Sequence, residues 1–265
     1  MCATSRRVAA GLCLGQVVTL ADLLVLAVTG VAAGIVSTVA SLASVVSYPV
    51  LLALGLPPLS ANVTNTVSLL FTGVGAAAGS RPELAGQGKR VRRLGLVTAL
   101  GGAAGAALLL ATPARTFEEA APVLIGGASL LLLLQPARPP GHADRERSPL
   151  LLGALFCVAV YVGYFGAAGG ILLLAVLTSM ITEPMARTNA LKNVVSGLAN
   201  AVAAVAFAAF GPVRWAAVLP LAAGFLIGGW TGPALVRRIP GRALRILIGL
   251  GGIALAIRLG LGAYH

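Results

Sequence analysis

Long apolar runs, separated by short stretches rich in charge, proline or glycine, fill most of this chain. An α-helix rises 1.5 Å per residue, so about 20 apolar residues cross a hydrocarbon core about 30 Å thick. Eight runs close to this length predict long membrane helices, at residues 20–41, 60–80, 92–112, 118–135, 149–168, 188–210, 215–235 and 242–260.

Two shorter apolar pieces, Ser44–Leu54 and Gly170–Ile181, each follow a long run. They are too short to cross a bilayer as helices, so they predict half-helices or re-entrant segments. The chain before and around each piece reads as a break, at 41–49 and at 164–170. Unwound backbone at such breaks presents N–H groups to an anion, although the same residues would also serve as simple turns.

The same order of long and short pieces occurs twice, which predicts two homologous halves. The first transmembrane repeat covers residues 1–135, a polar linker covers 136–148, and the second repeat covers 149–265. An offset of 128 aligns Asn65 with Asn193 and Ser68 with Ser196. An offset of 123 aligns two pairs of glycines, Gly101 and Gly105 with Gly224 and Gly228.

Basic loops indicate how the two halves are oriented. Five cations lie in residues 81–93, whereas the equivalent loop of the second half offers only Arg214. The next loop reverses this bias, because four arginines lie in residues 237–245. If basic loops face the cytoplasm, equivalent loops lie on opposite sides, as in an inverted repeat of five plus five crossings. Arg6 and Arg7 fit this topology less well, since it places the N-terminus outside.

Glycines four residues apart recur in the long runs and predict close helix packing. This spacing lets helix backbones approach each other inside lipid. The pairs are Gly30 and Gly34, Gly75 and Gly79, Gly101 and Gly105, and Gly224 and Gly228.

The composition excludes a water-soluble domain, because 58% of residues are hydrophobic and only 10% are charged. The net charge of +12 resides between apolar runs, which indicates contact with lipid headgroups and not with nucleic acid. The three cysteines and two histidines show no metal-ligand spacing, and none of the seven acidic residues lies in the middle of an apolar run. We therefore expect no metal, no cofactor, no catalytic residues and no enzymatic activity.

Two polar clusters open equivalent apolar helices, and polar groups inside a bilayer are costly enough to suggest function. One explanation is helix capping or bonding between helices; the other, which we favour, is a lining for a substrate site. Lys192, one of only two lysines, could supply charge to an anion or extend to the surface. The candidate residues are Asn62, Thr64, Asn65 and Ser68 in the first half, and Asn189, Lys192, Asn193 and Ser196 in the second.

The sequence resembles the sulfite exporter TauE/SafE family, also described as the toluene sulfonate uptake permease family. The similarity covers nearly the whole chain and lies in Ser47–Pro49, Leu54–Pro58, Ala61–Val67, Tyr164–Gly170 and Asn189–Val194. It adds Tyr48, Gly169 and Gly170 to the candidate site. The family's glycine-rich first break is replaced here by Ser41–Ser44, whereas Gly166, Gly169 and Gly170 keep the second.

The resemblance implies a multi-pass permease of the bacterial cytoplasmic membrane that moves sulfite, sulfonates or related small organic anions. With the all-helical pattern, it predicts a transporter that works by alternating access, with a small anionic substrate and the lipid bilayer as partners. An anion channel-like pore and a non-transporting membrane scaffold or assembly protein remain alternatives. The sequence leaves open whether the protein forms a homodimer.

Overall fold

The computed structural model describes residues 19–40, 42–134, 147–166 and 169–236, with single helical positions at 250, 253, 257 and 261. No strand occurs in these ranges. The helices are α2 (Leu20–Ala40), α3 (Ala43–Ala53), α4 (Pro58–Gly79), α5 (Arg81–Leu84), α6 (Gly88–Ala111), α7 (Ala114–Leu134), α8 (Pro149–Tyr164), α9 (Gly169–Met180), α10 (Met185–Phe210) and α11 (Trp215–Val236). The predicted run at 242–260 and most of the linker lie outside the described residues.

The helix boundaries follow from proline and glycine. Pro58 and Pro149 occupy the first position of α4 and α8, where the missing N–H of proline costs no hydrogen bond. Gly166 has φ +75°, a conformation that favours glycine, and here the chain leaves α8 before α9 begins. The predicted end of this helix was wrong, because the run predicted over 149–168 ends as a helix at Tyr164.

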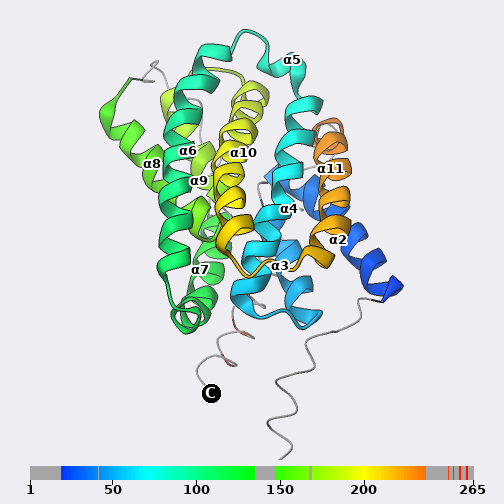
Figure 1. Cartoon of the computed structure of the whole chain (residues 1–265). Coiled ribbons are helices and arrows are strands. Elements are labelled where there is room, and N and C mark those ends of the chain that lie inside the picture. Colours follow the sequence, from blue (N-terminus) through cyan, green and yellow to red (C-terminus); the bar gives the residue numbers. More distant parts are fainter. Residues whose placement is uncertain are drawn as a thin grey trace, which may run out of the picture.

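Helices α4 and α10 cross at the centre of the molecule and run antiparallel (Figure 1). A Cβ placed on Gly73 would stand 3.2 Å from the Cα of Gly197, so the two helix backbones are in close contact at this crossing. The start of α10 lies beside α5, since the Arg187 side chain donates to the carbonyl of Ala85 at 2.8 Å. The end of α10 lies beside the start of α4, where the Ser60 hydroxyl donates to the carbonyl of Pro212.

One helix of each half packs against helices of the other half. Helix α6 of the first half packs against α8 and α10, and α11 of the second half packs against α2 and α4. The glycine pairs make these contacts: a Cβ on Gly105 would stand 2.0 Å from the carbonyl oxygen of Val160, and one on Gly228 would stand 2.2 Å from that of Val31. The predicted close packing at these glycines is confirmed, and the two contacts match under the repeat offset.

Four described helices contain spans long and apolar enough to cross a membrane, at Leu20–Thr38, Gly88–Ala111, Met185–Phe210 and Trp215–Ala234. Helix α4 is as long as these, but its first half carries most of its polar residues. Large apolar side chains face outward from the spans, including Val205 at 69% exposure and Leu219 at 75%. Exposed apolar surface of this kind belongs against lipid, so the chain is a membrane protein.

Candidate functional site

In the first half, the polar cluster ties α3 to α4. Ser47 donates a hydrogen bond to the amide oxygen of Asn65, and the Asn65 amide donates to the Ser44 hydroxyl at 3.1 Å. All three side chains are buried. A polar group buried without a partner is expensive, so these bonds fix how the half-helix α3 sits against α4.

The other candidate residues of α4 are also bonded within the protein. The Asn62 amide donates to the carbonyl of Tyr164 at 3.2 Å, and Thr64 accepts the backbone N–H of Arg214 at 3.0 Å. The Ser68 hydroxyl donates to the carbonyl of Thr64, one turn earlier in the same helix. Bonding between elements, part of the first explanation, therefore accounts for Asn62 and Thr64 as the structure holds them, whereas Ser68 is bonded within α4.

Aromatic rings pack where α3 meets the break after α8. Tyr48 is 2% exposed, and its ring meets that of Phe165 edge-on with 5.9 Å between centroids. Phe117 of α7 packs on Phe165 from another side at 5.7 Å. Tyr48 therefore lies at the junction of a half-helix with the break of the opposite half.

The second-half cluster on α10 is bonded differently. Lys192 is 1% exposed, and the Asn189 amide donates to the carbonyl of Thr38 at 3.1 Å. Asn193 and Ser196 are half-buried, and their side chains form no hydrogen bond with other described residues. Gly169 and Gly170 are buried at the start of α9. The amide of Asn193 and the hydroxyl of Ser196 are therefore left without a hydrogen-bond partner among the described residues.

The structure separates the two helix starts that the sequence suggested would share one pocket. Asn65 precedes the crossing at Gly73 by eight residues, and Asn193 precedes Gly197 by four. Because the helices run in opposite directions, these offsets add to about 18 Å along the axis at 1.5 Å per residue. Among the candidate residues, Asn193 and Ser196 lie nearest the crossing, within four residues of Gly197.

Sequence reasoning missed Thr72 of α4, one residue from the crossing. Its side chain is 5% exposed, and its hydroxyl has no hydrogen-bond partner within the described structure. The repeat offset of 128 pairs Thr72 with Asn200, so alignment of the halves was the signal that could have found it. Both central helices thus carry one polar stripe, Asn65, Ser68 and Thr72 on α4 and Asn193, Ser196 and Asn200 on α10.

An ion-pair network closes the end of the molecule where α6 and α10 begin. Glu183 accepts from Arg90 at 2.6 Å and from Arg187 at 3.0 Å. The hydrogen bond from Arg90 is the main cause that lowers the pKa of Glu183; burial opposes this effect, and the charges of both arginines add to it. Gln87 contributes a longer bond to the carbonyl of Arg187, at 3.4 Å. Within the described ranges, no three His, Cys, Asp or Glu side chains gather as metal ligands would.

Comparison with known proteins agrees with this arrangement of helices and breaks. A profile of the family described as "Sulfite exporter TauE/SafE" matches residues 26–259. The chain belongs to this family. The match extends the TauE/SafE assignment over both halves, including both breaks and both polar clusters, and the resemblance read from the motifs is confirmed.

Curated relatives of this TauE/SafE chain are bacterial. The chain is 25% identical to "Probable membrane transporter protein YfcA" of Escherichia coli K12 over 209 residues, 77% of each chain. It is 25% identical to "Probable membrane transporter protein ORF9" of Sinorhizobium sp over 230 residues, 86% of this chain and 88% of that one. A "Probable membrane transporter protein" of Haemophilus influenzae is 26% identical over 223 residues, 81% of this chain and 86% of the other. No solved structure matches the chain.

Proposed function

We propose that this protein is a secondary transporter for small oxyanions such as sulfite and sulfonates, a multi-pass protein of the bacterial cytoplasmic membrane that works by alternating access. Membership of a transporter family supports the class of activity. The names of the bacterial relatives support the setting. The substrate class rests on the chemistry of the site.

Support for an inverted repeat comes from helix direction and helix exchange. The equivalent helices α4 and α10 run antiparallel, as a two-fold axis in the membrane plane requires. The exchanged helices α6 and α11 make equivalent contacts through equivalent glycines. These contacts support two halves with opposite orientations, as in an inverted repeat of five crossings each.

One observation carries the site: Asn193 and Ser196 offer unbonded donors beside the crossing of the two central helices. Gly197 lies at the middle of α10, and inverted-repeat transporters bind substrate near the midplane at the repeat interface. An amide and a hydroxyl donate to oxyanions, and Lys192, one position before Asn193, would supply positive charge. Thr72 brings a further hydroxyl from α4.

Alternating access needs a closure at each end that opens in turn, and two sets of hydrogen bonds are suited to this. At one end, Arg187 holds the carbonyl of Ala85 and the carboxylate of Glu183. At the other, Ser60 and Thr64 hold the loop after α10 through Pro212 and Arg214. Releasing one set while the other stays closed would expose the site to one side.

The test is flux of sulfite and of a small sulfonate in proteoliposomes that contain the purified protein. Loss of a hydrogen bond to a charged ligand costs about 1.5 to 3 kcal/mol, so Asn193→Ala and Ser196→Ala should each weaken apparent affinity about 10- to 100-fold. Ser179→Ala is the matched control, because the exposed Ser179 hydroxyl bonds only to its own helix, at the carbonyl of Ala175. Wild-type protein that moves no small oxyanion, or Asn193 and Ser196 variants with unchanged KM and kcat, would refute the proposal.

A further inference from the structure

Two hydrogen bonds join the halves at equivalent positions. The Asn62 amide donates to the carbonyl of Tyr164 at 3.2 Å, and the Asn189 amide donates to the carbonyl of Thr38 at 3.1 Å. Each asparagine is the fifth residue of its helix, α4 or α10, and each acceptor lies five residues before the half-helix of its own half, α3 or α9. Donors and acceptors are thus equivalent under the repeat, and both bonds run from one half to the other. We call them the cross-half bonds.

Both acceptors are carbonyls at helix ends. Tyr164 is the last residue of α8, and Thr38 lies in the last turn of α2. The last four carbonyls of a helix have no donor within it, and a polar group buried without a partner is expensive. Asn62 and Thr38 are each 1% exposed, so water is a poor substitute for the asparagine amides there. Each cross-half bond therefore satisfies a helix end that its own helix cannot satisfy.

The cross-half bonds also determine where the half-helices begin. The chain leaves α2 and α8 close to these carbonyls and enters α3 and α9 a few residues later. A bond at the carbonyl therefore holds the start of each half-helix against the central helix of the other half, α10 for α3 and α4 for α9. Broken helices of this kind form the sites of repeat transporters, so their placement matters for transport.

Equivalence under the repeat separates these bonds from those that open and close. If the inward-facing and outward-facing states differ by which half adopts which conformation, a bond that both halves make in one state is made by both in the other. The bond between Ser47 and Asn65 has no such counterpart, because Leu173 stands in α9 where Ser47 stands in α3. Bonds of one half alone can differ between the two states, whereas the cross-half bonds are kept.

We propose that Asn62 and Asn189 are positioning residues, which hold the break of the opposite half in place in both states, and are not ligands of the substrate. Their role in transport rests on the proposed function, because only a transporter needs two states of access. The bonds themselves are properties of the fold. They can therefore be tested without a substrate.

The first experiment measures hydrogen–deuterium exchange of the full-length protein in lipid nanodiscs, peptide by peptide. Asn62→Ala should speed exchange on the order of fivefold at Phe165, in the other half, through the loss of one hydrogen bond. Asn189→Ala should have the same effect at Leu42, again in the other half. Exchange in the peptides of α6 should stay at the wild-type rate in both variants, which verifies that the protein is folded.

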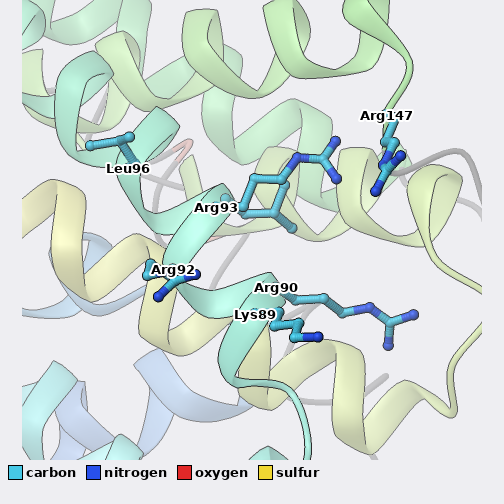
Figure 2. Close-up of a pocket in the computed structure, with 7 residues that line it drawn as sticks. Lys89, Arg90, Arg92, Arg93, Leu96 and Arg147 are labelled. Atoms are coloured by element: carbon cyan, nitrogen blue, oxygen red, sulfur yellow. The ribbon is translucent and has the colours of Figure 1, made fainter.

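Two control variants leave the cross-half bonds intact. Thr66→Val removes a buried hydroxyl of α4 that bonds within its own helix, at the carbonyl of Asn62. Arg92→Gln changes a side chain at the end of the molecule where α10 begins, on the wall of a cavity of about 800 Å³ that Figure 2 shows at the start of α6. Both controls should exchange as wild type does at Phe165 and Leu42. Loosening of the same-half break, of both breaks at once, or of neither in the asparagine variants would overturn the proposal.

The second experiment asks whether the asparagines position or bind, through flux of a small sulfonate in proteoliposomes. Asn62→Ala and Asn189→Ala should lower kcat about fivefold and change KM less than about twofold, whereas loss of a substrate ligand raises KM. An aspartate of the same shape donates only when protonated, so the flux of Asn62→Asp and Asn189→Asp, relative to wild type at each pH, should recover as the pH falls. A KM effect as large as that of Asn193→Ala would overturn the positioning role. Wild-type protein that moves no oxyanion would refute the proposed function, and the exchange experiment alone would then decide the cross-half bonds.

Discussion

Gly105, where α6 packs against α8, is the position at which one added methyl group should do most harm. The Cβ of an alanine there would stand 2.0 Å from the carbonyl oxygen of Val160 and 2.7 Å from the backbone nitrogen of Tyr164. Ordinary contact begins at 3.4 Å, so the first distance falls 1.4 Å short. Both neighbours are backbone atoms, which move only if the two helices separate.

The cost of Gly105→Ala follows from two opposing effects. Overpacking costs typically 1 to 3 kcal/mol, and a clash with backbone belongs at about 3 kcal/mol. Alanine favours a helix over glycine by about 1 kcal/mol, which leaves a net loss of about 2 kcal/mol. The measurement is the free energy of unfolding in mixed micelles during titration with dodecyl sulfate.

Gly153→Ala provides the matched control within α8. A Cβ at Gly153 would meet nothing within 4 Å, so only the helix preference acts and stability should rise by about 0.5 to 1 kcal/mol. The two variants should therefore differ by about 3 kcal/mol, the sum of a loss and a gain. If Gly105→Ala proved as stable as Gly153→Ala, α6 and α8 would not lie at the distance described, and the argument from glycine spacing would fail.

Three further predictions follow from hydrogen bonds and helix direction. Asn65→Ala should destabilise the protein by about 2 kcal/mol. Because Ser47 and Asn65 bond to each other, the double variant with Ser47→Ala should lose less stability than the two single variants together, as measured by chemical unfolding of all three. Folding lowers the pKa of Glu183, so the ionised side chain contributes stability that is complete above its ordinary pKa of 4.5 and disappears as the pH falls through the lower value of the folded protein. Between pH 6 and pH 3, the wild type should therefore lose about 1 kcal/mol more of its free energy of unfolding than Glu183→Gln does, as measured by thermal unfolding. Cysteines placed at Lys89 and Arg214 should react with an impermeant maleimide from opposite sides of the membrane, because these residues flank opposite ends of α10; labelling of both from one side would contradict the antiparallel arrangement.

The sequence predicted the helices well because a lipid core imposes a length and a polarity on every spanning element. Residues 215–235 were expected as a helix and α11 covers Trp215–Val236. The half-helices at α3 and α9 were also expected, from their shortness alone. The four-residue helix α5 was not, because so short a turn carries no periodic pattern that distinguishes it from a loop.

Partner choice between helices could not be predicted from the sequence. The spacing of Gly224 and Gly228 indicated a close contact, but any glycine-bearing helix could have supplied the other side. The roles of the polar residues were hidden for the same reason. Asn62 and Asn193 look equivalent in the sequence. Only the fold brings the carbonyl of Tyr164, over a hundred positions away, within hydrogen-bond distance of Asn62.

The exchange of α6 and α11 has a consequence for how the protein is made. Helix α2 leaves the ribosome long before α11, yet among the described helices it is α11 that covers the surface that α2 presents through Gly30 and Gly34. Before α11 is inserted, the glycine face of α2 must contact either lipid or an insertion factor. Neither half is a finished folding unit, so the two halves expressed as separate chains should accumulate only when both are present in one cell.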